Sequence, residues 1–306
     1  MDYNSVVDDI DNIVLYYDEP FGDSSCIPSN YVAKLARGKV TVALTGDCAD
    51  ELFGGYPWRY YRVFKSLSQT EFFDSYYEFW QRLVPDNEKV KLFSTNVYNQ
   101  INLREPREIF ERVFTFNDKL KYNTPEEHIN NSLYFESKTF LSGLFLVGDK
   151  LAMANGLEER FPFMDNDLVN FAQKVPIRHK LGNLENMKRI DENDFKKKSQ
   201  VYQTYDDGKN VLRKAMLDFM PQKIINRKKQ GFSAPDESWY RGENAAYIKE
   251  LLLSKRTVSA DYINQDYIKE IVDDHINNHV NHRLLIWSFM NFEWWCRIFL
   301  NNEKID

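Results

Sequence analysis

The chain has 306 residues, of which 43% are hydrophobic and 15% aromatic, so it can form one large domain or two modest ones and is not a disordered chain. Its 46 acidic and 40 basic residues give a net charge of −6, and no basic excess marks a nucleic-acid-binding surface. The three cysteines are far apart, which is typical of reduced thiols and argues against a disulfide framework or a zinc site.

The sequence shows no segment that directs a protein into or across a membrane. No apolar stretch approaches the roughly 20 residues that a membrane span requires. The first residues, MDYNSVVDDIDN, are acidic and lack the basic and apolar regions of a signal peptide. We therefore expect a cytoplasmic protein that acts on neither membranes nor nucleic acids.

The first 60 residues predict an α/β arrangement. NYVAKLAR has the apolar spacing of a short amphipathic helix, and Gly38 follows as its expected end. VTVALTG then predicts a buried strand that ends in a glycine turn. This order is typical of parallel α/β sheets, in which ligands bind beyond the carboxyl ends of the strands. The turn after this strand is therefore the first candidate for a functional site.

From about residue 60 onward the pattern is nearly all helical. TEFFDSYYEFWQRLV and YIKEIVDDHI place apolar residues three and four positions apart. The segment 181–210 is the most polar connection, and the closing RLLIWSFMNFEWWCRIFL predicts a buried helix whose tryptophans pack in the core. We therefore expect one domain over 1–306, with an α/β part at 1–60 and a mainly helical part at 61–306.

The segment TGDCADE, directly after the predicted strand, is the first candidate site. Gly46 allows the backbone to turn sharply and to approach a ligand closely. Asp47, Asp50 and Glu51 place carboxylates around the turn, and such carboxylates can hold Mg²⁺ together with substrate phosphates. Acidic residues also favour the first turn of a helix. Composition alone leaves both interpretations open.

Two further segments combine charges with turns. In GDKLAMANGLEERFPFMD, helical periodicity ends at Gly156, and Glu158, Glu159 and Arg160 then lie between apolar neighbours. Charges in such positions either serve a site or pair with one another to brace the fold. In INRKKQGFSAP, three cations precede a Gly-Phe turn, where a lysine can face a phosphate or simply be solvated.

Taken together and in this order, LTGDCADELFGGYPW, DKLAMANGLEERFPFMD and NRKKQGFSAP resemble the synthetase half of the glutamine-dependent asparagine synthetases. DEPFGDSSCIP and LIWSFMNFEWWCRIF resemble the same family, so the likeness extends from about Val14 to Leu300. It implies an ATP-dependent conversion of aspartate to asparagine through an aspartyl-AMP intermediate, which glutamine-derived ammonia attacks. ATP and Mg²⁺ are the implied cofactors.

The resemblance assigns roles to individual residues by their position in the matching segments. By this resemblance, Thr45, Gly46 and Asp47 are expected to face the nucleotide and the acyl-adenylate in the active site. Asp50 resembles the metal-binding carboxylate, and Lys229 the lysine that neutralises the developing charge on the phosphates. Glu158 resembles a glutamate near the site of ammonia attack, whereas Arg160 and Asp165 are expected to brace the fold.

Two parts of the family's pattern do not occur in the sequence. One is the pyrophosphate loop Ser-Gly-Gly-x-Asp-Ser, which neither the glycine pair at 54–55 nor Gly38-Lys39 replaces. The other is the glutaminase, because Asp2 stands where its cysteine should follow the initiator methionine. Cys48 occupies a turn position where many relatives have glycine, and we expect it to pack and not to act as a nucleophile.

The fold class that follows is α/β: an amino-terminally truncated parallel sheet of the adenine-nucleotide alpha-hydrolase-like, PP-loop ATPase type, followed by a largely α-helical region. Loss of the first strands would leave a sheet edge and apolar helix faces uncovered. Three interpretations stay open: a fragment, one half of a split enzyme whose partner chain supplies the glutaminase and pyrophosphate loop, or a non-catalytic interaction subunit. Either enzyme form would be inactive alone, and amidation of another carboxylate, such as a polysaccharide sugar acid, is a further alternative.

Overall fold

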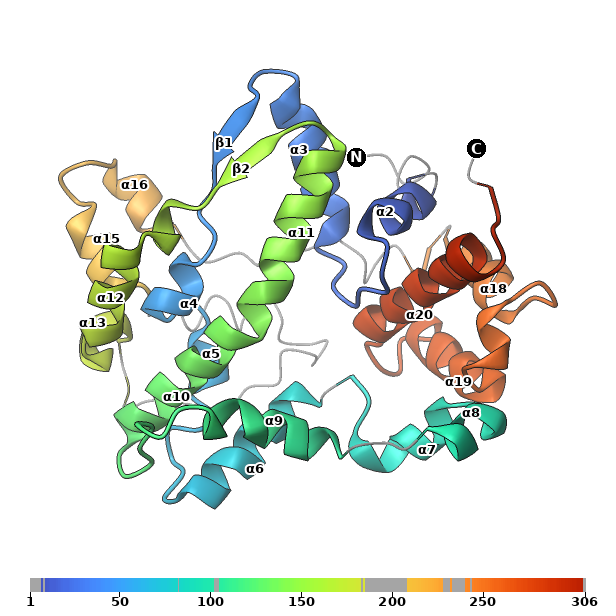
Figure 1. Cartoon of the computed structure of the whole chain (residues 1–306), viewed down its shortest axis with the longest axis horizontal. Helices are drawn as coiled ribbons and strands as arrows, with labels where there is room; N and C mark the ends of the chain where they lie inside the picture. The colour runs from blue at the N-terminus through green and yellow to red at the C-terminus, as the bar shows by residue number, and fades with distance from the viewer. Residues whose placement is uncertain are drawn as a thin grey trace.

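The computed structural model describes residues 9–81, 83–101, 105–182, 208–227, 240–242 and 244–304, together with residues 7, 184 and 232. Within these residues the structure is mostly helical, with one small parallel sheet. Figure 1 shows the long helix α11 crossing the middle of the molecule, with α2 and the carboxyl-terminal helices on one side and α12, α13, α15 and α16 on the other.

The first elements follow the predicted α/β order. They are α2 (Ile10–Tyr17), α3 (Cys26–Arg37), β1 (Val42–Leu44), α4 (Ala49–Phe53) and α5 (Pro57–Tyr60). The amphipathic helix expected from NYVAKLAR is confirmed as part of α3, and Gly38 is the residue that ends it. The acidic turn therefore connects β1 to α4.

The sheet pairs β1 in parallel with β2 (Glu158–Arg160), so it takes one strand from each predicted part of the chain. The predicted strand is confirmed, but the expectation that it is buried is wrong. Val42 is 47% and Leu44 75% exposed, whereas Ala43 packs with the cluster of Ala33 from α3 and Ala152 from α11. One face of β1 is thus covered by helices and the other face is open.

An aromatic core lies between three of the helices that follow, α6, α9 and α10. The elements of this part are α6 (Gln69–Trp80), η1 (Asp86–Glu88), α7 (Lys89–Leu92), α8 (Thr95–Gln100), α9 (Pro106–Thr115), α10 (Pro125–Lys138) and α11 (Phe140–Ala154). Phe72 of α6 contacts Phe114 of α9 edge-to-face, and Phe114 stacks on Phe135 of α10 at 5.3 Å between ring centroids. Such aromatic pairs add to the area that the rings bury, so they hold these three helices together.

α11 ends where the sequence predicts. Its last residue is Ala154, and Gly156 follows with φ +71°, a left-handed conformation that glycine adopts without strain. The next elements are β2, η2 (Pro162–Met164), α12 (Asn166–Lys174), α13 (Ile177–Lys180), α15 (Asn210–Ala215) and α16 (Gln222–Ile225). Asp165 caps α12 by accepting the backbone N–H groups of Asp167 and Leu168, in agreement with its expected bracing role.

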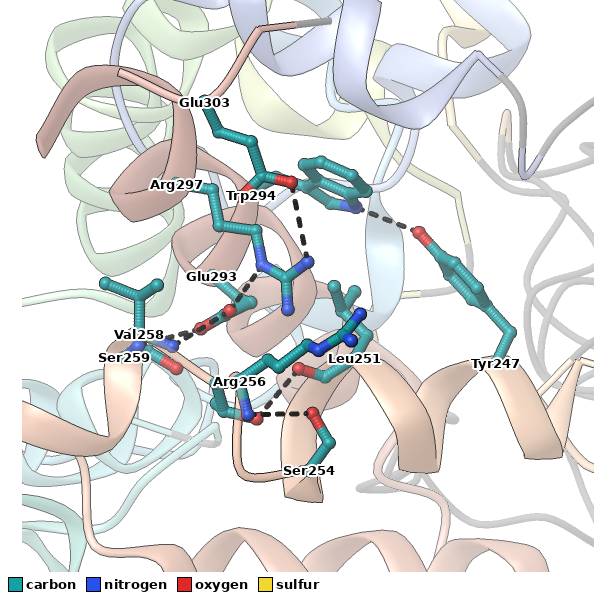
Figure 2. Close-up of polar contacts among 11 residues, drawn as sticks. Tyr247, Leu251, Ser254, Arg256, Val258, Ser259, Glu293, Trp294, Arg297 and Glu303 are labelled. Carbon is teal, nitrogen blue, oxygen red and sulfur yellow. Dashed lines mark hydrogen bonds and ion pairs between the residues drawn. The ribbon is translucent and has the colours of Figure 1, made fainter. Parts of the chain in front are cut away.

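The carboxyl-terminal part contains α18 (Ala245–Leu253), η3 (Ser259–Asp261), α19 (Gln265–Ile276), α20 (Arg283–Trp295) and the π-helical turn η4 (Cys296–Leu300). The predicted buried helix is confirmed as α20, in which Trp287 is completely buried. Trp294 and Trp295 are only partly buried at the edge of the same core. The Nε1 atom of Trp294 donates to the Tyr247 hydroxyl at 2.9 Å (Figure 2).

A buried carboxylate ties α20 to the start of η3 (Figure 2). Glu293 is fully buried and accepts the backbone N–H groups of Val258 at 3.0 Å and Ser259 at 2.7 Å. Nε of Arg297 lies 2.6 Å from Oε1 of Glu293, and Nη1 of Arg297 lies 3.9 Å from Oε1 of Glu303. The charge of Glu293 is therefore compensated in the interior, as a buried carboxylate requires.

Candidate functional site

A cavity of about 270 Å³ lies at the carboxyl end of β1. Its wall contains the three residues that the resemblance assigns to the nucleotide and intermediate side: Thr45, Gly46 and Asp47. The wall also contains Ser25 and Ser29 around the start of α3, Gly148 of α11 and Glu159 of β2. The structure thus brings three predicted residues together with residues of α3, α11 and β2.

Among the residues that the structure describes, two polar atoms in the cavity wall are buried without a hydrogen-bond partner: Oγ1 of Thr45 and Oε2 of Glu159. Burial, followed by the negative charges of Asp47 and Asp149, raises the pKa of the Glu159 carboxyl. A group in this environment takes up a proton more readily than an exposed glutamate. The cavity therefore offers a hydroxyl and a basic carboxylate to a ligand at the end of the strand.

The position of Glu159 depends on a glycine in α11. A Cβ atom added at Gly148 would lie 2.5 Å from Oε2 of Glu159, which is too close for two non-bonded atoms. The absence of a side chain at this position lets the carboxylate of β2 lie directly against α11. This close approach defines one wall of the cavity.

Glu158 and Arg160 lie on the other face of β2 from Glu159, because successive residues of a strand point to opposite faces. Their side chains are about half exposed, at 49% and 52%, and they form an ion pair with one another. The pairing anticipated for this segment is present, but it lies within one strand and does not connect two elements. Glu158 is not among the residues that line the cavity.

The sequence pattern does not distinguish Glu159 as a site residue, because residues 158–160 form one charged group between apolar neighbours. The three residues form a strand, in which successive side chains point to opposite faces. This alternation places Glu159 on the cavity face and the other two residues on the opposite face. A strand of three charged or polar residues has no apolar alternation that reveals this period from the sequence.

Asp50 does not line the cavity, and its carboxylate forms an ion pair with a distant segment. Its Oδ1 atom lies 2.8 Å from Nζ of Lys209, the residue immediately before α15. The same oxygen would be 1.5 Å from a Cβ atom at Gly55, so the carboxylate lies against the Gly55 backbone. An ammonium group thus lies beside one of the two carboxylate oxygens, and the metal role of Asp50 stays a prediction. Within the described ranges, no group of three or more His, Cys, Asp or Glu side chains is placed to hold a metal ion.

Cys48 is the residue before α4, and its backbone is left-handed at φ +76°. L-residues other than glycine, asparagine and aspartate rarely adopt this conformation, which agrees with the glycine expected at this position in relatives. The thiol is buried, and burial followed by the charges of Glu51 and Asp47 raises its pKa to about 12. Because the thiolate is the reactive form, the structure supports a packing role for Cys48.

A buried polar network lies beneath α4. Glu136 of α10 is fully buried and accepts hydrogen bonds from the hydroxyls of Tyr60 at 3.1 Å and Tyr76 at 2.9 Å. Nη1 of Arg59 lies 3.6 Å from the same carboxylate, and its guanidinium lies 4.0 Å from the ring centroid of Tyr56. Burial raises the pKa of Glu136 to about 7, even though Arg59 lowers it. The network fixes α5, which follows the acidic turn, to α6 and α10.

Lys229, the predicted catalytic lysine, lies outside the described residues, as does most of the polar connection at 181–210. Phe232, three residues further on, lines the cavity. The role of Lys229 therefore stays a prediction.

Comparison with known protein families decides the kinship of the chain. The family model described as asparagine synthase matches residues 1–297. The chain belongs to the asparagine synthase family. Asparagine synthetase [glutamine-hydrolyzing] 1 of Bacillus subtilis (strain 168) is 28% identical over 325 aligned residues, which cover 97% of this chain and 46% of that protein.

Other relatives agree with this membership. A putative asparagine synthetase [glutamine-hydrolyzing] of Mycobacterium tuberculosis (strain ATCC 25618 / H37Rv) is 26% identical over 96% of this chain and 45% of its own length. Amidase chyE of Penicillium rubens (strain ATCC 28089 / DSM 1075 / NRRL 1951 / Wisconsin 54-1255) is 25% identical over 47% of this chain and 20% of its own length. The chain thus spans about half the length of the asparagine synthetases that it matches.

In the part of the chain that the structure describes, no helix is both long enough and apolar enough to span a membrane.

Proposed function

We propose that the chain takes part in ATP-dependent amide formation, in which aspartate becomes asparagine through an aspartyl-AMP intermediate and glutamine-derived ammonia supplies the nitrogen. Family membership supports the reaction class. The single observation that carries the proposal to this site is that Thr45, Gly46 and Asp47 line a cavity at the carboxyl end of a parallel strand. We propose a PP-loop ATPase type of sheet for the same reason.

In the first step, a carboxylate oxygen of aspartate attacks the α-phosphorus of ATP, and the bond to pyrophosphate breaks. A Cβ atom added at Gly46 would meet nothing within 4 Å, so the space beside this backbone is open to a reacting group. The Thr45 hydroxyl has no hydrogen-bond partner among the described residues, and we propose that it orients the acyl-adenylate. Lys229 is proposed to face the negative charge that develops on the phosphates.

ATP and Mg²⁺ are the proposed cofactors, and Mg²⁺ supplies charge neutralisation on the phosphates when it is bound. No step depends on Asp50 as its ligand, because this carboxylate is paired with Lys209. A metal role for Asp50 requires the two groups to separate first.

In the second step, the nitrogen of ammonia attacks the acyl carbon, the bond from this carbon to the oxygen of AMP breaks, and the nitrogen loses a proton. The resemblance places Glu158 near this attack. We propose that Glu159 is the proton acceptor, because it lies in the cavity wall, has an unpartnered oxygen and has a raised pKa. Glu158 would then act from outside the cavity, through its pair with Arg160.

The test is the aspartate-dependent exchange of radioactive pyrophosphate into ATP, followed by transfer to ammonia. The chain is assayed alone and mixed with the part of the Bacillus subtilis relative that the match leaves uncovered. Exchange with aspartate supports the proposal, and absence of exchange with every carboxylate contradicts it. Glu159→Gln should keep the exchange and reduce the ammonia step at least tenfold, whereas Glu158→Gln is the matched comparison. A larger loss in Glu158→Gln would return the role to Glu158.

A second candidate is amidation of a different carboxylate, such as a sugar acid of a polysaccharide. The match to amidase chyE over 47% of the chain supports this second candidate. Exchange that requires another carboxylate in place of aspartate would support it.

The third candidate is a non-catalytic subunit, or half of a split enzyme, whose partner chain carries the glutaminase and pyrophosphate loop. If the chain is half of a split enzyme, the added part of the relative should restore pyrophosphate exchange. If the chain is a non-catalytic subunit, the added part should not restore it.

A further inference from the structure

A second cavity, of about 610 Å³, lies beside α4 and shares no wall residue with the cavity at the end of β1. Its wall is built by α4, α10, the start of α11, α12, the end of α13 and the segment 117–121. Apart from Glu51, which the sequence groups with Asp47 and Asp50 as a possible Mg²⁺ carboxylate, none of the residues considered for the amide-forming site lies in this wall.

The feature that marks the cavity is a buried lysine. Lys180, the last residue of α13, is only 3% exposed and lines the cavity. Among the described residues, no carboxylate forms an ion pair with it. Burial lowers the pKa of its ammonium group to about 8. A buried ammonium without a counter-charge is unfavourable, and a bound anion is the partner that compensates it.

The other charges around the cavity add to the positive potential at Lys180. Three exposed lysines lie in the same wall: Lys119, Lys121 and Lys138. The two carboxylates of the wall are already engaged. Glu127 accepts the backbone N–H groups of Asn123 at 2.7 Å and Thr124 at 3.2 Å, where it closes the amino-terminal cap of α10.

Glu51, the second carboxylate, is directed to a neighbouring tyrosine. Its Oε1 atom accepts the hydroxyl of Tyr56 at 3.0 Å, and Glu51 itself is only 2% exposed. Burial, the largest cause, raises its pKa, which weakens its negative charge as a partner for Lys180. The wall as a whole therefore carries more available positive than negative charge.

The remaining wall residues indicate what accompanies the anionic group. Leu52, Leu141, Met164 and Val169 supply apolar surface, and Asn130 and Gln173 supply amide groups. No arginine belongs to the described wall, so the cations are point charges and not planar forks. A wall that contains four lysines suits a tetrahedral group with two negative charges and several acceptor oxygens. We propose that this cavity binds a small organic phosphate, whose phosphate group pairs with Lys180 and whose organic part lies against the apolar wall.

The proposal is tested by titration calorimetry of the full chain with glycerol 3-phosphate, and in parallel with inorganic phosphate and succinate. Glycerol 3-phosphate should bind saturably, more tightly than either comparison ligand, and less tightly as salt is added. Lys180→Met should weaken binding at least tenfold. Lys174→Met is the matched control, because Lys174 is an exposed residue of α12 outside the cavity wall and should leave binding unchanged.

Absence of saturable binding, or equal binding by Lys180→Met and the wild type, overturns the proposal. Tighter binding of succinate would overturn the phosphate class. A second measurement needs no variant: the rate at which acetic anhydride labels Lys180, followed by peptide mass spectrometry with and without glycerol 3-phosphate. The ligand should slow labelling of Lys180 several-fold and leave Lys174 unaffected, and unchanged labelling contradicts the assignment. Neither measurement depends on amide formation, so failure of one proposal does not affect the other.

Discussion

Removal of the Glu293 carboxylate should be among the most destabilising single changes in the carboxyl-terminal part. This group accepts two backbone N–H groups, from Val258 and Ser259, and compensates Arg297 (Figure 2). Both the carboxylate and Ser259 are at most 1% exposed, so water does not replace the lost acceptor. The change Glu293→Ala therefore leaves donors unsatisfied in the interior and a cation without its buried partner.

The magnitude follows from these contacts. Each unsatisfied buried donor costs about 1–3 kcal/mol, and breaking a buried charge pair costs about 3–5 kcal/mol. The two figures describe largely the same loss and are not added. We expect Glu293→Ala to lower the free energy of unfolding by about 4 kcal/mol. Glu293→Gln keeps one acceptor oxygen and should lose less.

The assay is urea unfolding followed by circular dichroism and tryptophan fluorescence, with the change in midpoint converted through a common slope. Glu303→Gln is the control, because this residue is about half exposed and lies 3.9 Å from Arg297. Its effect should stay below about 1 kcal/mol. A loss of less than about 1 kcal/mol in Glu293→Ala would refute the view that this carboxylate holds α20 to the preceding segment.

Other changes probe the region around the acidic turn. Because the pKa of Glu136 is raised from 4.5 to about 7, its contribution to the free energy of unfolding is complete below about pH 4.5 and is lost as the pH rises through 7. Glu136→Gln should therefore remove about 3 kcal/mol of pH dependence between pH 4 and 8, as measured by urea unfolding; an unchanged slope would contradict the shift. Gly148→Ala should displace Glu159 and slow the ammonia step more than pyrophosphate exchange, and equal effects on both steps would argue against a role in proton transfer. Asp50→Asn should break the ion pair with Lys209, which should then be acetylated faster. The same change should reduce pyrophosphate exchange only if Asp50 separates from Lys209 and binds Mg²⁺.

The elements that the sequence predicted best are those with a strong local pattern. The apolar spacing of the segments around Phe72 and Ile268 specifies α6 and α19, and the β-branched run before Thr45 specifies β1. Burial was predicted less well, because it depends on what covers an element. Val42 and Leu44 have a strand's local preference, but in the described part of the structure no helix covers their face.

The site was predicted where it is local and missed where it is not. Thr45, Gly46 and Asp47 are adjacent in sequence, and a glycine turn after a strand is a recognisable signal. The contribution of Glu159 requires the pairing of two strands that are far apart in the chain. The burial of Lys180 likewise results from several distant segments, and a lysine in a polar stretch is ordinarily solvated. Neither position carries a local pattern that separates it from surface charge.

The pairing of β1 with β2 has a consequence for how the protein acquires a binding site. The walls of the first cavity come from the segments before residue 50 and after residue 140, so neither segment encloses a ligand by itself. Recognition can therefore begin only after a contact between distant parts of the chain has formed, and such contacts form slowly because a long loop must close first. A ligand in this cavity would in turn favour the closed pairing through its binding energy. Occupancy of the cavity and integrity of the fold are thus linked quantities, and a measurement of either reports on the other.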